Sequence, residues 1–192
     1  MKLNHHPDPS TVLAYAAGAV YEGFSLVVAA HLESCRQCRE ALAHAEAMGG
    51  ELLEELPAAE MADEGMGQIW QRIAAEPAAV RTERPVRSDR RLPAVLSSLV
   101  PGGLDAIRWR TLVPGIKQHL LSGVESDQGS VRLLHIAPGT TLPHHTHLGS
   151  ELTLVLQGSF SDETGHYRCG DLADVADALA LAERLRRTVA ET

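Results

Sequence analysis

The stretch HLESCRQC, residues 31–38, sets a histidine four residues ahead of the first of two closely spaced cysteines. On one continuous helix His31, Cys35 and Cys38 would share a face, but their span would cover roughly 10 Å of the axis, too long for three ligands of one ion. The simplest alternative places His31 in the last turn of one helix, Cys35 in a turn, and Cys38 at the start of the next helix, where the dipole favours a thiolate. The stretch therefore predicts a helical corner at which three metal ligands converge.

A fourth ligand is needed, because zinc sites of the Cys2His2 and Cys3His kinds are closed by protein side chains. His5 or His6, just before the first predicted helix, can supply it. Two buried thiols beside a solvated histidine are one alternative. A CxxC redox centre is another, but no β-strand precedes the motif. The CxxC spacing and the upstream histidine pair favour zinc.

Composition limits the classes of partner. The chain has 192 residues, of which 44% are hydrophobic and 22% charged, enough for one large domain or two small ones. A net charge of −8 disfavours direct nucleic-acid binding and favours a basic partner protein. The N-terminus lacks a signal-type apolar core, and the nearby run FSLVVAA is too short to span a bilayer. We therefore expect a cytoplasmic protein without a membrane partner, with reduced thiols at Cys35 and Cys38.

The apolar pattern changes partway along the chain. Residues 8–75 repeat apolar positions at helical steps, with breaks at Gly18, Gly23 and the pair Gly49-Gly50. Three prolines among arginines follow, without apolar periodicity. We predict a helical domain over residues 1–76, a linker over 77–93 and a second domain over 94–192.

The second domain carries short runs with β-type alternation, separated by turn signals such as PG, ESDQGS and PGTT. Its last stretch, residues 171–192, is rich in alanine and leucine and predicts a helical segment. The predicted fold class is therefore α + β, with an N-terminal helical bundle and a C-terminal antiparallel β domain.

HxxxCxxC in a small helical unit, with a histidine near residue 6, resembles the zinc-binding anti-sigma factors over about the first 75 residues. In that family the domain clamps an extracytoplasmic-function sigma factor and hides its polymerase-binding surface. The resemblance implies that His6, His31, Cys35 and Cys38 are zinc ligands, with His6 preferred to His5. Acidic residues in this half suit a basic partner surface, although a solvated face would look the same. They are Glu40, Glu46, Glu51, Glu54, Glu55, Glu60, Asp63 and Glu64.

The helical segment GMGQIWQRI has an apolar side formed by Met66, Ile69, Trp70 and Ile73. It could dock into a partner's groove with Trp70 as the anchor. Packing against the protein's own helices is an equal alternative.

Residues 139–158, GTTLPHHTHLGSELTLVLQG, match every position of the first conserved cupin motif, G(X)5HXH(X)3-4E(X)6G. His145 and His147 would project to one face of a strand, and Glu151 adds a carboxylate. This ligand set suits zinc or another divalent transition metal with positions left open. The resemblance implies a cupin-like antiparallel β-barrel.

The second cupin motif is only partly present. Residues 165–171, GHYRCGD, resemble its opening, but no histidine follows His166 to supply the usual fourth ligand. The predicted barrel is therefore incomplete, with a terminal helical segment in place of closing strands. His119, His135 or His166 could substitute, yet each is more simply a strand histidine.

The two halves together resemble the ChrR type of anti-sigma factor, from the N-terminal histidine pair to about Asp171. In that family the helical domain holds the sigma factor, and the cupin domain is needed for its release under singlet oxygen or organic peroxide. The resemblance implies a regulatory protein and not an enzyme. The alternative is a metal-dependent cupin enzyme, a dioxygenase or isomerase, that uses His145, His147 and Glu151.

Overall fold

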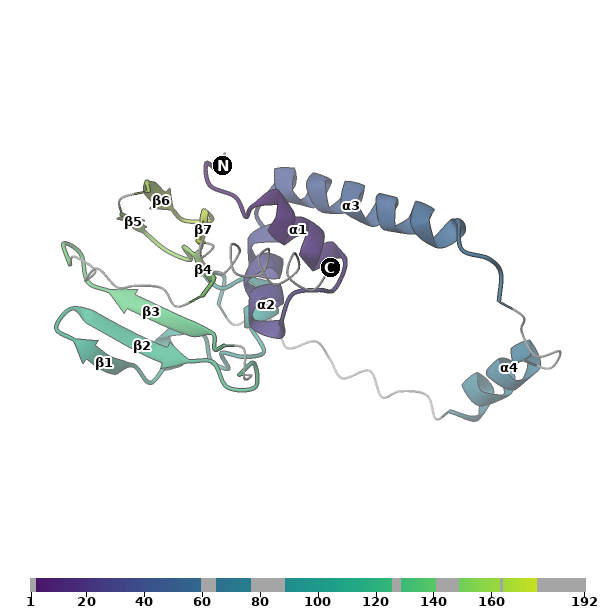
Figure 1. Cartoon of the computed structure of the whole chain (residues 1–192). Coiled ribbons are helices and arrows are strands. Elements are labelled where there is room, and N and C mark those ends of the chain that lie inside the picture. Colours follow the sequence, from purple (N-terminus) through teal and green to yellow (C-terminus); the bar gives the residue numbers. More distant parts are fainter. Residues whose placement is uncertain are drawn as a thin grey trace, which may run out of the picture.

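The computed structural model describes residues 3–59, 65–76, 89–125, 129–140, 149–162 and 164–175. Helices α1 (Pro9–Ala16), α2 (Glu22–Leu32) and α3 (Arg36–Glu54) pack together in the N-terminal half. Helix α4 (Gly65–Ala75) stands apart from the other described elements (Figure 1). Among the described helices, none combines the length and apolar character needed to cross a membrane.

Local chemistry sets the ends of the first helix. Asp8 caps the start of α1 by accepting the Ser10 N–H at 2.8 Å, and Pro9 suits the first helical turn because its missing N–H would have no partner there. Gly18, at φ +65°, lets the chain leave the helix in a conformation that side chains with a Cβ rarely adopt. The break predicted at Gly18 is therefore confirmed.

The break predicted at Gly49-Gly50 is wrong, because α3 continues through both glycines to Glu54. Glycine costs about 1 kcal/mol relative to alanine inside a helix but removes no backbone hydrogen bond. Strong helix formers on both sides outweigh that cost. Gly23 also lies inside a helix, near the start of α2.

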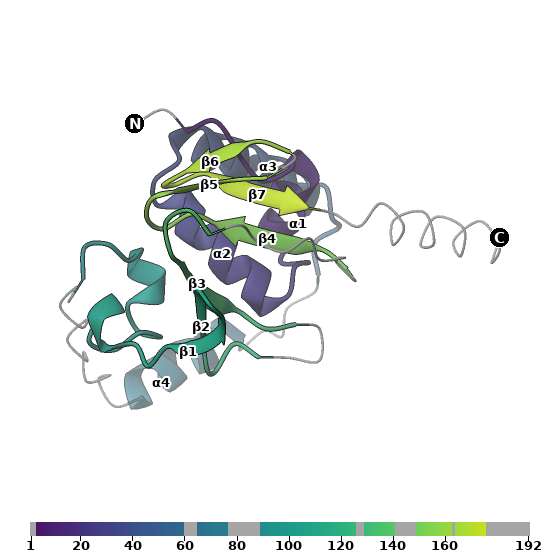
Figure 2. The same ribbon diagram turned by 90° about the vertical axis from the view of Figure 1, so that its left-hand side faces the viewer.

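Seven strands form three antiparallel sheets in the described part of the C-terminal half (Figure 2). Two short 3-10 helices, η1 (Ala94–Leu96) and η2 (Leu104–Ala106), precede them. The first sheet has the order β1-β2-β3, the second pairs β4 with β7, and the third pairs β5 with β6. The strand bounds are β1 Arg110–Val113, β2 Ile116–Leu120, β3 Arg132–Ile136, β4 Glu151–Leu154, β5 Ser159–Ser161, β6 His166–Arg168 and β7 Leu172–Val175.

Strand β7 corrects the prediction of a helix over residues 171–192. Leu172–Val175 instead pairs with Glu151–Leu154, in a register that sets Leu172 opposite Leu154. Leu172 and Ala173 are both buried, and extended pairing lets them be covered while β4 takes up their backbone hydrogen bonds. Alanine's helix propensity is a weaker effect than this tertiary pairing. Residues 176–192 lie outside the described residues.

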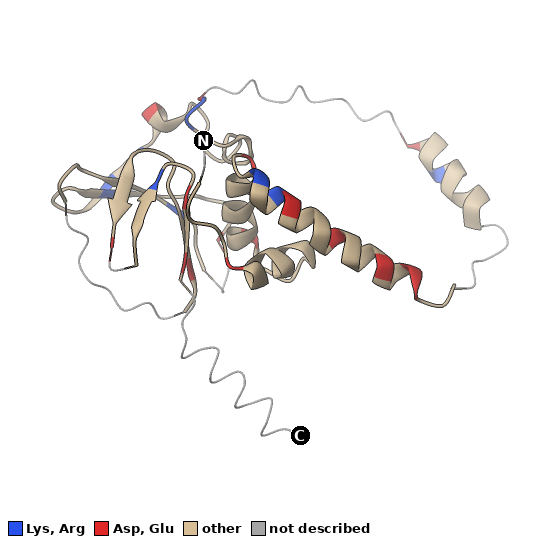
Figure 3. Ribbon diagram, turned by 90° about the horizontal axis from the view of Figure 1, so that it is seen from above, with Lys and Arg blue, Asp and Glu red and all other residues tan. Residues whose placement is uncertain are grey.

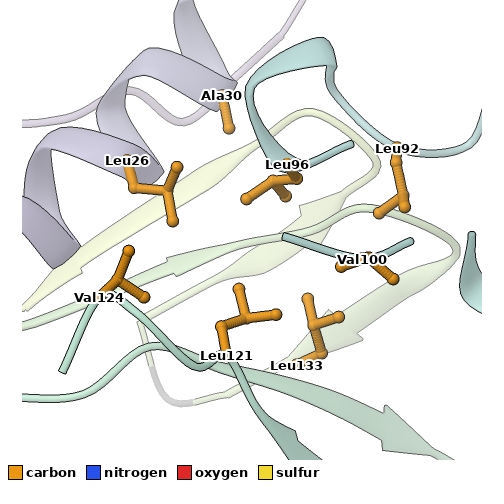
Figure 4. Close-up of a cluster of buried hydrophobic side chains, with 8 residues drawn as sticks. All are labelled: Leu26, Ala30, Leu92, Leu96, Val100, Leu121, Val124 and Leu133. Atoms are coloured by element: carbon orange, nitrogen blue, oxygen red, sulfur yellow. The ribbon is translucent and has the colours of Figure 1, made fainter. Parts of the chain in front are cut away.

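One hydrophobic core joins elements from both halves of the chain (Figure 4). Leu26 and Ala30 of α2 face Leu92, which lies inside the predicted linker, and residues from beyond it: Leu96, Val100, Leu121, Val124 and Leu133. The carboxylate of Glu33 adds polar contacts by accepting the backbone N–H groups of Ala94 and Val95 at 2.8 and 2.9 Å. Helix α2 therefore belongs to the packing of both predicted domains, and the division between them stays a prediction.

The N-terminal segment lies along β7, far from it in sequence. Leu172 donates its backbone N–H to the His5 carbonyl at 3.2 Å. Asp174 accepts the Asp8 N–H at 2.9 Å and the Thr11 hydroxyl at 2.7 Å. The Leu172 bond holds the residue just before His6, and the Asp174 bonds hold the start of α1.

Candidate metal centre

His31 lies in the last turn of α2 and is completely buried. Its Nδ1 atom is 2.9 Å from the Gly170 carbonyl oxygen, which can only accept, so Nδ1 carries the proton and donates it. The opposite ring atom, Nε2, is buried without a hydrogen-bond partner in the residues that the structure describes. A histidine that donates one N–H to a carbonyl and presents the other nitrogen bare has the arrangement of a metal ligand.

The two cysteines lie where the sequence predicted. Cys35 is the N-cap of α3, its Sγ accepts the Cys38 N–H at 3.5 Å, and Cys38 lies in the first turn. Both side chains are buried, beside Leu3, Val28 and Leu32. The predicted helical corner, with His31 before it and Cys38 after it, is confirmed.

His6 completes the group. Its Nδ1 atom lies 3.3 Å from the Cys35 sulfur and 3.4 Å from the Cys38 sulfur. The potential ligand atoms of His6, His31, Cys35 and Cys38 all lie within 4.8 Å of one another. Tetrahedral zinc with ordinary bond lengths separates a nitrogen from a sulfur ligand by about 3.5 Å. Two imidazoles and two thiols at these separations fit a closed zinc site.

His5 is placed differently from His6. Its ring packs on Tyr167, with centroids 4.2 Å apart, and lies beside Gly165. The neighbouring histidines therefore point to separate environments, and of the two only His6 joins the cysteine pair.

Burial sets the electrostatics of the site. Desolvation lowers the pKa of His31, although the hydrogen bond to Gly170 acts in the opposite direction. Desolvation, followed by the hydrogen bond and charge of Cys35, raises the pKa of the Cys38 thiol to about 12. The pocket thus favours a neutral imidazole with a free lone pair and opposes an uncompensated thiolate. A divalent cation would supply the missing positive charge and displace thiol protons.

Sequence reasoning missed the contribution to this site of Gly170 and of Asp171, whose carboxylate accepts the backbone N–H groups of Asn4 and His5 at 2.8 and 3.2 Å, next to His6. The available signal was the GHYRCGD stretch, which carries both residues. Its family resemblance pointed to the β domain, so a contact with the helical half was not expected.

The predicted C-terminal metal site is only partly visible. Glu151 begins β4, is half-buried, and accepts the Thr153 hydroxyl at 3.2 Å. His145 and His147 lie outside the described residues. This second site therefore stays a prediction.

Of the three substitute histidines considered for that site, His135 and His166 have other contacts. His135 is exposed on β3, with its ring centroid 5.6 Å from that of Trp109. His166 is exposed on β6, and its Nδ1 is 2.7 Å from the Ser161 hydroxyl. His119 is half-buried on β2.

Comparison with known proteins defines the class. Residues 102–174 match the family described as the ChrR cupin-like domain. The anti-sigma-E factor ChrR of Cereibacter sphaeroides is 39% identical over 180 residues, which cover 92% of this chain and 81% of that protein. A chain in the crystal structure of Rhodobacter sphaeroides SigE in complex with the anti-sigma ChrR matches with a TM-score of 0.77 and 37% identity, covering 92% of this chain and 89% of the other.

The chain belongs to the ChrR family of anti-sigma factors. The predicted fold class, N-terminal helices followed by a cupin-like antiparallel β domain, is confirmed together with the family resemblance.

Proposed function

We propose that this protein is an anti-sigma factor that binds and sequesters a sigma factor of the extracytoplasmic-function class. The observation that carries the proposal is the convergence of His6, His31, Cys35 and Cys38 at the α2–α3 corner, in a chain of the ChrR family. The solved relative is a complex of SigE with ChrR, which supports a sigma factor as the partner. The protein acts by binding, as a cytoplasmic regulator and not as an enzyme.

A structural zinc ion would set the direction of α3. The proposed ligands come from the segment before α1, the end of α2 and the start of α3. Closing them around one ion supplies folding free energy and fixes the angle between the two helices. The residues beyond the corner are then presented to a partner in a defined orientation.

The exposed apolar residues of α3, its end and α4 form the proposed sigma-binding surface. Large exposed apolar surfaces on a soluble chain commonly mark protein interaction sites. Trp70 of α4 is 63% exposed, so its packing against the described helices is not observed. The surface comprises Met48, Leu52, Leu53, Leu56, Met66, Ile69, Trp70 and Ile73, all exposed.

Negative charge lies along the helix that carries part of this apolar surface. Acidic residues line α3 (Figure 3), among them Glu46, Glu51 and Glu54. An acidic helix attracts a basic partner surface and repels nucleic acid, which speeds encounter and favours the correct partner. We therefore propose a protein partner and no direct nucleic-acid contact.

The C-terminal domain is proposed to sense the stress that releases the sigma factor. His145, His147 and Glu151 would hold zinc or another divalent transition metal there, and imidazole and thiol groups are oxidisable. Singlet oxygen and organic peroxides are the proposed signals. In this scheme residues 1–76 bind the sigma factor, residues 77–93 link the domains, and residues 94–192 respond to the oxidant.

The test is co-expression of the full chain with the sigma factor encoded beside its gene, followed by co-purification and an in vitro transcription assay. The full chain should co-purify with the sigma factor and inhibit transcription. A combined Cys35→Ser and Cys38→Ser variant should lose both properties. Cys169→Ser is the matched control, because Cys169 is exposed and lies outside the metal cluster. Absence of a complex with the zinc-loaded wild-type chain would contradict the proposal.

A further inference from the structure

The turn between β6 and β7 contacts the side chain of His31 and the backbone of the segment that leads to His6. The Gly170 carbonyl oxygen accepts a hydrogen bond from His31 Nδ1 at 2.9 Å. The next residue, Asp171, accepts the backbone N–H groups of Asn4 and His5 with Oδ1, at 2.8 and 3.2 Å. His5 immediately precedes the second histidine of the cluster. One turn of the β domain therefore contacts one proposed ligand, His31, and the residue just before another, His6.

Asp171 is built into this turn and has little freedom to move. Its side chain is 1% exposed, and its second oxygen accepts the Arg168 N–H at 2.9 Å. Three backbone N–H groups thus satisfy a buried carboxylate, and the Leu172 N–H holds the His5 carbonyl at 3.2 Å. The residue before His6 is therefore held by both its N–H and its carbonyl.

Gly170 allows the turn to approach the N-terminal segment closely. Its φ of +91° belongs to the region that glycine favours, and a Cβ at this position would lie 2.7 Å from the Leu3 side chain. A larger residue would be strained at this φ, and its Cβ would require the end of the Leu3 side chain to shift.

We propose that the Gly170-Asp171 turn positions the ligands of the N-terminal metal site, so that the β domain controls how tightly the helical domain holds its metal. Asp171 is the positioning residue for His6, and the Gly170 carbonyl fixes the tautomer and orientation of His31. This inference rests on the proposed metal site. Partners of this kind behind metal ligands typically change metal affinity by about 10- to 100-fold when removed.

The same contacts connect the domain proposed to sense the oxidant with the domain proposed to bind the sigma factor. A displacement of β6, β7 or their turn would release the hydrogen bonds that hold His31 and the residue before His6, without touching either cysteine. The α2–α3 corner would then lose metal faster, and with it the fixed orientation of α3. The β domain can therefore weaken partner binding through the metal site.

The experiment compares zinc release from full-length wild type, Asp171→Asn and Asp174→Asn. Zinc transfer to a chromophoric chelator gives the release rate, and the cobalt-loaded proteins give absorption bands that report ligand geometry. Asp174→Asn is the matched control, since Asp174, on β7, binds the same N-terminal segment but contacts Asp8 and Thr11 at the start of α1. Circular dichroism checks that each variant is folded.

Asp171→Asn should release zinc about 10- to 100-fold faster and alter the cobalt spectrum, whereas Asp174→Asn should resemble wild type. Equal release rates and spectra for folded Asp171→Asn and wild type would overturn the proposal. If Asp171→Asn does not fold, imidazole ¹H–¹⁵N spectra of the zinc-loaded wild type decide: protonation of His31 at Nδ1 supports the proposal, and protonation at Nε2 overturns it. A wild-type chain that takes up no metal at this site would instead refute the proposed site itself.

Discussion

The Nδ1 atom of His6 lies 3.3 Å from the Cys35 sulfur, although 29 positions separate the two residues in the sequence. The helical corner brings His31, Cys35 and Cys38 together locally. His6 lies on a different segment, which is held by the backbone N–H of Leu172, at the start of β7, and by the Asp171 carboxylate. The proposed metal site therefore depends on two kinds of structure, a local helix–turn–helix and a long-range strand contact.

Cys35→Ser and Cys38→Ser should each lose the N-terminal metal. Structural zinc supplies apparent binding free energy of about 10–16 kcal/mol in small domains at neutral pH, and a serine hydroxyl does not replace a thiolate ligand. Metal content by mass spectrometry and thermal unfolding of the full chain would measure the loss. Cys169→Ser should keep both wild-type values; a comparable loss there would place the metal elsewhere.

Without metal, alkaline pH should destabilise the protein through Cys38. Burial, together with the neighbouring Cys35, raises the pKa of this thiol from 9.0 to about 12 in the folded chain. The unfolded chain gives up the proton near the ordinary pKa, whereas the folded chain retains it. The stabilising contribution is therefore complete below pH 9 and is lost as the pH rises towards 12.

The measurement is the free energy of unfolding of metal-free wild type and metal-free Cys38→Ala at about pH 8 and about pH 10. Relative to metal-free Cys38→Ala, metal-free wild type should have a lower free energy of unfolding at the higher pH than at the lower pH. The zinc-loaded wild type should lack this shift, because its thiolates are already formed. A pH-independent difference between the metal-free proteins would contradict the assigned environment of Cys38.

Local sequence signals predicted the corner well. The spacing from His31 to Cys38 excludes a continuous helix around one ion, so it predicted a turn at Cys35, which the structure shows to be the N-cap of α3. The choice of His6 over His5 came from a family resemblance and not from spacing. In the structure the His5 ring instead packs against Tyr167, a residue far away in sequence.

Long-range pairing was harder to predict. The run from Leu172 to Val175 has helix-forming composition, and only its partner β4 makes it a strand. The contact between Gly170 and His31 likewise spans 139 positions and leaves no periodic trace in the sequence. Such contacts depend on how the two halves pack, which local composition does not encode.

The shared core predicts that both halves unfold together. Leu121→Ala, at a completely buried position, and Leu26→Ala on α2 should each lower the free energy of unfolding by about 2–5 kcal/mol. Each should shift one common transition, followed by far- and near-ultraviolet circular dichroism. Leu53→Ala, on an exposed part of α3, should change stability by no more than about 0.5 kcal/mol. Two separate transitions, each moved by only one variant, would show that the halves fold independently.

The C-terminal site should hold its metal more weakly than the N-terminal site. Only three predicted ligands, His145, His147 and Glu151, are available, so water must complete the coordination. Dialysis against a moderate chelator should remove this metal first, and Glu151→Gln should abolish it while leaving the N-terminal metal in place. Two equally tight metals per chain would show that another residue, with His166 the first candidate, completes the second site.

Trp70→Ala should weaken sigma-factor binding without destabilising the protein. Trp70 lies on the same side of α4 as Met66, Ile69 and Ile73, and all four side chains are exposed. Removing a tryptophan anchor from an interface typically costs about 2 kcal/mol or more, equivalent to roughly a 30-fold increase in Kd. Titration calorimetry with the purified sigma factor would measure Kd, and thermal unfolding would show that stability is unchanged because α4 has no buried residues.

Gln68→Ala is the matched control for Trp70, because it shortens an exposed side chain on the opposite side of the same helix. It should leave the Kd for the sigma factor within about twofold of wild type, as expected outside an interface hot spot. Equal weakening by both substitutions would indicate that the helix itself, and not its apolar side, is required. Wild-type affinity in Trp70→Ala would exclude α4 as the anchoring element and leave the exposed end of α3, with Leu52 and Leu53, to make the contact.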